Sequence, residues 1–263
     1  MDLSVVIPCY NASPTIGSAL NSILRQSHRP DEVVIVDDGG GDSVALRQRV
    51  AEFSRQLNIT VVSHGRNRGA PVARNTGIAT SKGRFVALLD ADDFWAREKV
   101  QVQLAVMGET NCDFSCHGYC EDTTLTALTA QSRVPKHKRL RVVDFVWGNP
   151  VVTPTVMFKR IAAPIFHEGL RRCDDYKAWI EAVSGGARFI KICANLAGGA
   201  KPAIGHSGLT ADVDKMHYAF ITCLEMIAEG GITPRWAPAL AKAIEYCKYP
   251  LRKGRVAGKT LLR

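Results

Sequence analysis

Residues 85–93 read FVALLDADD, an apolar run of five residues that ends abruptly in a cluster of aspartates. A short, continuous apolar run is typical of a strand that is covered on both faces of a parallel sheet. The sequence before it repeats the pattern, because apolar runs at 3–8, 32–37 and 59–63 alternate with stretches of helical period. Strands that alternate with helices in this way predict right-handed crossovers and a largely parallel sheet over the first 95 residues.

Capping signals and apolar periodicity predict the remaining elements. Ser13-Pro14 provides an N-cap and a first-turn proline for the first helix, and Asp42 or Ser43 caps the second. The third helix is expected at 70–81. Beyond Ala96 we expect helices at about 97–107, 175–183, 212–229 and 235–247, strands near 113–119, 153–159 and 188–193, and a long loop at 122–141.

The composition excludes several classes of protein. The chain has 263 residues, of which 46% are hydrophobic and 22% charged, which is ordinary for a globular protein and unlike a disordered chain or a coiled coil. Its net charge of +9 predicts anionic partners. Uncharged apolar stretches reach about half of the ~20 residues that a spanning helix needs, and no signal-peptide core precedes the first strand. We therefore expect a cytoplasmic protein, and its eight irregularly spaced cysteines to be reduced.

Polar residues follow each of the four predicted N-terminal strands. Ligands of open parallel sheets bind beyond the carboxyl ends of the strands, so these residues should gather at one edge. They are Pro8-Cys9-Tyr10-Asn11, Asp37-Asp38 with three glycines, His64-Gly65-Arg66-Asn67 with Arg74 on the next helix, and Asp90-Ala91-Asp92-Asp93. Together they predict a ligand site at this edge.

The aspartate cluster is the most informative of these signals. Three carboxylates within four residues repel one another, and a divalent cation relieves the repulsion. Hard carboxylate oxygens suit Mg²⁺ or Mn²⁺. A solvated acidic turn that also caps the next helix is the alternative, which stays open for Asp93, whereas metal binding is favoured for Asp92.

Three other residues each have two possible roles. Tyr10 stacks on a nucleobase or sits at the rim of the core. Arg74 reaches a phosphate with a bidentate fork or is a surface arginine paired with an acid. Asn67 contributes to the ligand site or holds its own loop by side chain–backbone hydrogen bonds.

Four segments together resemble the family 2 glycosyltransferases of the GT-A fold. They are VVIPCYN at 5–11, VDDGGGDS at 36–43, NRGAPVARNTGIATSKG at 67–83 and FVALLDADD at 85–93. The resemblance implies an α/β, Rossmann-like, mostly parallel sheet flanked by helices, with a C-terminal helical extension. It also implies an inverting glycosyltransferase of the hexosyltransferase type, with a nucleotide-sugar donor, most often UDP-linked, and Mn²⁺ or Mg²⁺ held by a D-x-D motif.

The resemblance assigns roles to individual residues. It implies nucleotide binding by Pro8, Tyr10, Asn11, Asp38, Asn67, Arg74 and Asp90. Asp92 would hold the metal against the diphosphate. The family usually has serine in the position of Gly40, so a hydroxyl contact is absent here.

A second acidic motif lies in the other half of the chain. The family's Glu-Asp pair, which opens a helix and includes the catalytic base, resembles Asp174-Asp175. We favour Asp175 as the base, because the second position keeps the family's residue, and hold Asp174 in reserve; a helix N-cap with a first-turn acid is the alternative. The segment 205–210 resembles a loop that closes over the donor, which brings His206 toward the metal.

The resemblance also predicts how the chain is divided. Residues 1–95 would bind the nucleotide sugar, 96–210 would form the acceptor-binding and catalytic half of the same domain, and 211–263 would supply C-terminal helices and a basic tail. The family implies a saccharide or lipid-linked acceptor in surface polysaccharide biosynthesis. Residues 248–263 contain six Lys/Arg and no acid, which suits either peripheral contact with an anionic membrane at the inner face of the cell membrane or a solvated terminus.

A binding protein without transferase activity is the rival hypothesis. The positive charge suits a nucleic-acid-binding or nucleotide-binding α/β protein. However, the acids gather at the predicted ligand edge, and no recognisable nucleic-acid motif is present. We therefore expect no nucleic-acid partner.

Overall fold

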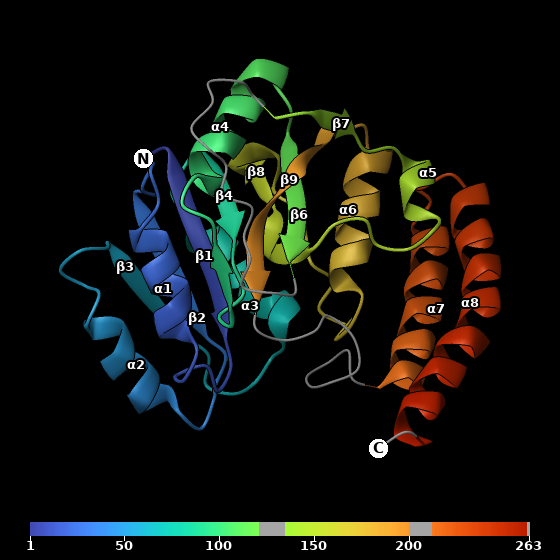
Figure 1. Cartoon of the computed structure of the whole chain (residues 1–263), viewed down its shortest axis with the longest axis horizontal. Coiled ribbons are helices and arrows are strands. Elements are labelled where there is room, and N and C mark those ends of the chain that lie inside the picture. Colours follow the sequence, from blue (N-terminus) through green and yellow to red (C-terminus); the bar gives the residue numbers. More distant parts are fainter. Residues whose placement is uncertain (121–134, 200–211, 262–263) are drawn as a thin grey trace.

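The structure is a computed structural model that describes residues 1–120, 135–199 and 212–261, with side chains described as far as Gly254. Its described strands form one sheet in the order β3-β2-β1-β4-β8-β6-β9-β5, and β7 pairs with β9 (Figure 1). The strands are β1 Leu3–Cys9, β2 Glu32–Asp37, β3 Ile59–Ser63, β4 Phe85–Leu88, β5 Asp93–Trp95, β6 Phe114–Cys120, β7 His137–Arg139, β8 Met157–Lys159 and β9 Phe189–Gly199. The helices are α1 Ile16–Leu24, α2 Ser43–Ala51, α3 Ala70–Thr80, α4 Lys99–Thr110, α5 Val142–Phe145, α6 Asp174–Ser184, α7 Val213–Gly230 and α8 Trp236–Leu261.

The N-terminal half has the parallel topology that the sequence predicts. β1 pairs in parallel with both β2 and β4, and β2 pairs in parallel with β3. The chain runs outward from β1 to β3 and then returns to β4 on the other side of β1. The order of the strands therefore reverses between β1 and β4, and the carboxyl ends of these two strands flank the crevice in which α/β proteins bind ligands.

The second half of the sheet is mixed, and here several predicted boundaries were wrong. The strand expected at 153–159 begins as a 3-10 turn at Thr153–Thr155, and only β8 pairs with its neighbours, antiparallel to β4 and β6. β7 lies inside the stretch expected to be a loop; residues 121–134 of that stretch lie outside the described residues. β9 runs on to Gly199 instead of ending at 193, because its far end pairs with β5, which follows the aspartates and was not predicted.

Two helix ends also differ from the prediction. α1 begins at Ile16 with Thr15 as its N-cap residue, so Ser13-Pro14 precedes the helix instead of starting it. α8 continues to Leu261, although Pro250 lies inside it. Pro250 removes the N–H that would bond to the carbonyl of Tyr246, but both residues lie on the exposed side of the helix, where water can replace that bond.

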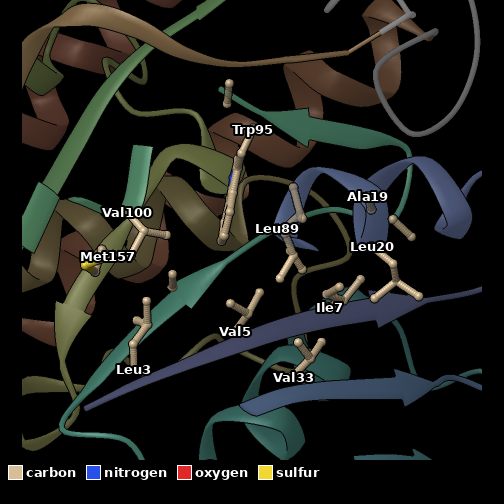
Figure 2. Close-up of a cluster of buried hydrophobic side chains, with 14 of the residues drawn as sticks. Leu3, Val5, Ile7, Ala19, Leu20, Val33, Leu89, Trp95, Val100 and Met157 are labelled. Atoms are coloured by element: carbon tan, nitrogen blue, oxygen red, sulfur yellow. The ribbon is translucent and has the colours of Figure 1, made fainter. Parts of the chain in front are cut away.

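Apolar side chains cover both faces of the sheet. Leu3, Val5 and Ile7 of β1 point to one face, where they pack with α1, α2 and α4 (Figure 2), and Val6 points to the other, where α3, α6, α7 and α8 contribute. α3 approaches β1 closely, because a Cβ at Gly77 would collide with the side chain of Val6. A glycine at position 77 is therefore what allows this close packing.

A buried tryptophan ties the aspartate loop to the second half of the sheet. The Trp95 indole N–H donates to the carbonyl of Pro154 at 2.8 Å, and the Lys99 ammonium lies 3.6 Å from the centre of the Trp95 ring. Burial lowers the pKa of Lys99. From α4, Gln103 donates to the carbonyl of Thr155 at 3.0 Å. The loop that carries Asp90 and Asp92 is thus fixed to the turn at Thr153–Thr155.

Candidate active site

Two adjoining cavities lie at the carboxyl edge of the sheet. The first, of about 740 Å³, is called the β1 cavity; the second, of about 660 Å³, extends beside α6, α7 and α8 and is called the α6 cavity. The β1 cavity brings together Pro8, Tyr10, Asn11, Asp38, Asn67, Arg74, Asp90 and Asp92, which are all the described residues that the sequence predicts for nucleotide and metal binding. Asp174 and Asp175 line the α6 cavity. His206 lies outside the described residues.

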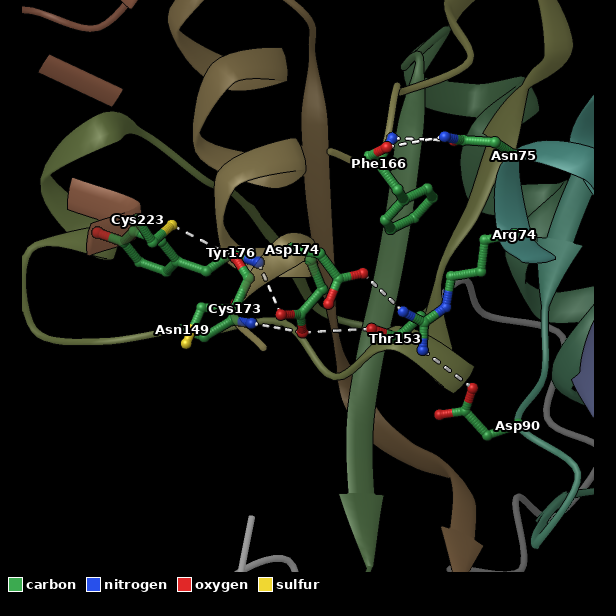
Figure 3. Close-up of polar contacts among 11 residues, drawn as sticks. Arg74, Asn75, Asp90, Asn149, Thr153, Phe166, Cys173, Asp174, Tyr176 and Cys223 are labelled. Carbon is green, nitrogen blue, oxygen red and sulfur yellow. Dashed lines mark hydrogen bonds and ion pairs between the residues drawn. The ribbon is translucent and has the colours of Figure 1, made fainter. Parts of the chain in front are cut away.

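Arg74 stands where the two cavities meet. Its guanidinium donates to Asp174 Oδ2 at 2.8 Å and to Asp90 Oδ1 at 3.3 Å, and it lies 5.4 Å from the centre of the Phe166 ring (Figure 3). The side chain is only 10% exposed, so the alternative of a surface arginine was wrong about its location, although the pairing with an acid that it expected is present. Burial opposes the positive charge, but the carboxylates of Asp174 and Asp90 outweigh it and raise the pKa of Arg74. Arg74 is therefore a fixed cation between two acidic segments.

The aspartates after β4 have different surroundings. Asp92 is exposed and lines both cavities. Asp93 is buried, begins β5 and accepts a hydrogen bond from the Tyr119 hydroxyl at 2.7 Å. The alternative of a solvated, helix-capping turn was therefore wrong for Asp93, since Glu98 is the N-cap residue of α4.

The charge balance around Asp90 suits a divalent cation. Burial raises the pKa of Asp90 and Asp92 raises it further, whereas Arg74 opposes the shift, so negative charge here is only partly compensated. Among the residues that the structure describes, no group of three or more His, Cys, Asp or Glu side chains gathers closely enough to hold an ion. Mg²⁺ typically takes one or two protein carboxylates and completes its shell with water and substrate phosphates. Asp90 and Asp92 fit that pattern, although they do not make a closed metal site.

Asp175 is held by hydrogen bonds from three directions. Its Oδ2 accepts from the Asn149 amide at 2.9 Å and from the Thr153 hydroxyl at 3.3 Å, and its Oδ1 accepts from the backbone N–H of Tyr176 at 2.8 Å (Figure 3). Burial and then the charge of Asp174 raise the pKa of Asp175 to about 6, although Arg74 acts in the opposite direction. A carboxylate with a pKa near the working pH is suited to accept a proton.

The two carboxylates of the acidic pair therefore have different hydrogen-bond partners. Both residues lie in the first turn of α6, and the preceding Cys173 has a left-handed backbone with φ of 60°. Asp174 is engaged by Arg74, whereas Asp175 lies among neutral donors. A first-turn acid also interacts favourably with the helix dipole, and both residues satisfy this part of the alternative. The N-cap part was wrong, because the N-cap residue is Cys173.

Asp38 lines the β1 cavity but is occupied by internal partners. Its carboxylate accepts from the backbone N–H of Gly69 at 2.7 Å and of Arg68 at 3.0 Å, and it lies 2.6 Å from His64 Nδ1. The side chain thus holds the loop before α3 in place. Contact with a nucleobase remains a prediction for this residue.

Gly40 stands where the family usually has serine, and its neighbours explain the difference. A Cβ there would lie 2.8 Å from both the backbone nitrogen and the side-chain oxygen of Asn11. That oxygen accepts a hydrogen bond from the backbone N–H of Gly41 at 2.9 Å. The two loops at the carboxyl ends of β1 and β2 are therefore in direct contact, with no room for a serine side chain.

The structure also adds residues that sequence reasoning missed. Arg171 lines both cavities and is exposed. Its position shortly before the acidic pair in the sequence could have identified it as a site residue. Asn149 and Thr153, which position Asp175, gave no signal, because they lie in a segment without a motif and reach the site only through the turn before β8.

Comparisons with known proteins agree with this description. The family described as "Glycosyl transferase family 2" matches residues 4–166. The putative teichuronic acid biosynthesis glycosyltransferase TuaG of Bacillus subtilis is 36% identical over 59% of this chain and 58% of its own length. An Escherichia coli protein, "UDP-Glc:alpha-D-GlcNAc-diphosphoundecaprenol beta-1,3-glucosyltransferase WfgD", is 28% identical over 68% of each chain.

Solved structures share the fold. S. aureus TarS 1-349 in complex with UDP superposes with a TM-score of 0.70 at 20% identity, covering 95% of this chain and 72% of that one. The mannosyltransferase PcManGT from Pyrobaculum calidifontis, in complex with GDP-Man and Mn²⁺, has a TM-score of 0.68 at 22% identity and covers 97% and 73%.

The fold defines a class, the proteins of the GT-A fold. Within that class, the chain belongs to glycosyl transferase family 2. It spans little more than half the length of the TuaG relative. In the part of the chain that the structure describes, no helix has the length and hydrophobicity needed to cross a bilayer.

Proposed function

We propose that this protein transfers a sugar from a nucleoside-diphosphate donor, with UDP-sugars favoured, to an acceptor hydroxyl with inversion at the anomeric carbon. The observation that carries the proposal is the cluster at the junction of the cavities. There Arg74 lies between Asp90 and Asp174. Asp175, the next residue in the chain, has a raised pKa. The family membership of the chain supports the same reaction.

The donor would occupy the β1 cavity. Tyr10 is exposed and lines this cavity, in a position to stack on a base, and Asn11 and Asn67 supply amide groups. The diphosphate would lie near Arg74 and Arg171, both of which line the two cavities. Cations here stabilise the charge that develops on the departing nucleoside diphosphate.

A divalent cation, Mn²⁺ or Mg²⁺, belongs to this proposal. Asp92, with Asp90 beside it, would hold the ion against the diphosphate, and His206 is retained from the sequence as a further candidate. When bound, the ion would supply positive charge to the leaving group. PcManGT, whose structure contains Mn²⁺, has the same fold and supports the idea.

Asp175 would act as the general base. The acceptor hydroxyl would enter the α6 cavity, give its proton to the Asp175 carboxylate and attack the anomeric carbon from the side opposite the diphosphate. Asn149 and Thr153 would keep the carboxylate oriented. Such a base contributes roughly 10²–10⁴-fold to the rate, and the positioning of two bound substrates adds to it.

The acceptor would be a saccharide or a lipid-linked intermediate of surface polysaccharide biosynthesis. TuaG is named for teichuronic acid biosynthesis and WfgD for a diphosphoundecaprenol acceptor, which supports this class. The reaction would take place in the cytoplasm. The basic stretch 248–263 would hold the protein at the inner face of the cell membrane.

A thermal-shift panel tests the donor. UDP-, GDP-, CDP- and dTDP-sugars are compared with and without Mn²⁺, because a ligand that binds the native state raises the Tm by mass action. We expect one donor to stabilise the protein, and to do so more with the ion. If no nucleotide sugar shifts the Tm in either condition, the proposal is wrong.

A further inference from the structure

One side of α8 is exposed and uncharged from Trp236 to Gly254. The residues on this side recur every three or four positions, so they form one stripe along the helix. The stripe, called here the α8 outer face, consists of Trp236, Ala239, Leu240, Ala243, Tyr246, Cys247, Pro250, Leu251 and Gly254. Its large apolar members are well exposed, from 44% for Leu240 to 68% for Leu251. At about 100° per residue the stripe spans an arc of about 140°.

The opposite side of α8 packs against the rest of the protein. Ala237, Ala241 and Glu245 are buried, and Glu245 lies 2.8 Å from His217 of α7. α7 and α8 lie side by side at one end of the molecule, with α8 outermost (Figure 1). Ala241, Ile244 and Lys248 also line the α6 cavity. The helix therefore forms a wall between the proposed acceptor site and the outside.

Lysines border the α8 outer face. At helical spacing, Lys242 and Lys253 fall on one edge of the stripe. Lys248 lies beyond the other edge, where it lines the α6 cavity and donates to the carbonyl of Trp147 at 2.6 Å. Lys242 pairs with Glu225 at 2.6 Å and Lys253 with Asp214 at 3.1 Å. These ion pairs are partly exposed, so they are weak and can exchange for other anions. Long lysine stems allow the ammonium groups to rise beside an apolar surface.

We propose that the α8 outer face lies in the headgroup region of an anionic bilayer. A stripe with tryptophan and leucine beside lysines is the pattern of an interfacial helix. A second copy of the chain is a poorer occupant, because α8 contains six Lys/Arg and one acid, so a twofold contact would bring two helices of net positive charge together. The choice of a bilayer as the partner rests on the membrane contact in the proposed function, and the α8 outer face adds the residues that would make the contact.

This orientation connects the bilayer to the catalytic site. α8 has its outer face in the headgroups and its inner face on the α6 cavity, so the cavity lies about one helix diameter, roughly 10 Å, from the lipid surface. A lipid-linked acceptor can then keep its tail in the bilayer while its terminal sugar reaches Asp175. The geometry explains why the terminal helix both lines the cavity and exposes an apolar side.

Vesicle co-sedimentation of the full chain tests the proposal. Vesicles of phosphatidylcholine with an equal part of phosphatidylglycerol are compared with vesicles of phosphatidylcholine alone, without donor or acceptor. The test variant is Leu240→Glu with Leu251→Glu, and Ile165→Glu is the matched control, because Ile165 is 82% exposed on a different element. Both leucines would lose their burial in the bilayer, so we expect the double variant to lose at least ~100-fold in partitioning.

The outcomes separate the competing explanations. The proposal is supported if the wild type and Ile165→Glu bind anionic vesicles and the double variant does not, with the melting temperature unchanged. It is overturned if all three proteins partition equally, or if light scattering reveals a dimer that the double variant dissociates. Transfer to a soluble acceptor is measured in parallel, because the double variant should retain it. In the wild type, transfer without vesicle binding overturns the membrane proposal alone, whereas vesicle binding without transfer contradicts the proposed function alone.

Discussion

Arg74 and Asp174 lie one hundred positions apart in the sequence, and their side chains meet at 2.8 Å in a buried ion pair. Arg74 belongs to α3, at the edge of the β1 cavity, and Asp174 opens α6, at the edge of the α6 cavity. The same guanidinium reaches Asp90. The pair therefore fixes the distance between the proposed donor site and the proposed catalytic base.

Removing Arg74 should damage the fold as well as the site. Arg74→Ala leaves Asp174 buried without its cation, and breaking a buried pair in this way costs about 3–5 kcal/mol. Asp90, which is partly exposed, loses the same partner. The free energy of unfolding, measured by urea titration, checks this. Arg171→Ala is the control, since an exposed arginine at the same junction should change stability by no more than about 0.5 kcal/mol. Equal stabilities of the two variants would contradict the structural role of Arg74.

Asp175→Asn should separate activity from stability. We expect transfer to fall at least ~10²-fold, because the base is lost. The pKa of Asp175 rises from 3.8 to about 6 on folding, so the ionised carboxylate destabilises the native state above pH 6, and below pH 3.8 it does not. The Tm of the variant at pH 7.5 should therefore equal or exceed that of the wild type. A variant that melts lower at pH 7.5 would argue against this assignment.

The pH dependence of transfer should report the same carboxylate. A base works deprotonated, so kcat/KM should rise with pH through about 6 and level off above it. The Thr153 hydrogen bond lowers the pKa of Asp175, and Thr153→Val should therefore move this limb to higher pH. Initial rates measured over about 2 pH units on either side of the limb check the shift. An unmoved limb would place the titration on another group.

Asp92→Ala should abolish transfer and the effect of the metal on donor binding. Asp92 is exposed at the junction of the cavities, so its loss leaves the core intact. Calorimetric titration of UDP with and without Mn²⁺ checks the coupling. The wild type should bind UDP more tightly with the ion, whereas the variant should bind equally in both conditions. Retention of more than a few per cent of wild-type activity would exclude Asp92 as the metal-binding residue.

Gly40→Ser should weaken the protein although it introduces the residue that the family usually has. The new Cβ would lie 2.8 Å from the backbone nitrogen of Asn11, which cannot move without shifting the loop after β1. Overpacking of this kind costs about 1–3 kcal/mol. Gly41→Ser is the matched control, because its Cβ would meet only the Asn11 oxygen, at 4.0 Å. Thermal melting of both variants decides the point.

The sequence by itself determined the parallel half of the fold and the location of the site. Strands that are covered on both faces carry continuous apolar runs, and the polar residues that follow them, from Tyr10 to Asp92, must meet at one edge. These signals are local, because each strand and its loop are contiguous in the chain. The acidic pair at 174–175 was also visible, as the start of a helix.

The resemblance favoured Asp175 over Asp174, but only the tertiary structure gives a physical reason for distinguishing them. The pattern of residues is nearly the same at both positions, and their difference arises from Arg74 on one side and from Asn149 and Thr153 on the other. The mixed order of β8, β6, β9 and β5 was likewise beyond local reasoning, since short strands such as β5 form only where a distant partner supplies their hydrogen bonds. Periodicity fixes which face of an element is apolar, whereas long-range packing decides what that face meets and which ionisable group is left without a counterion.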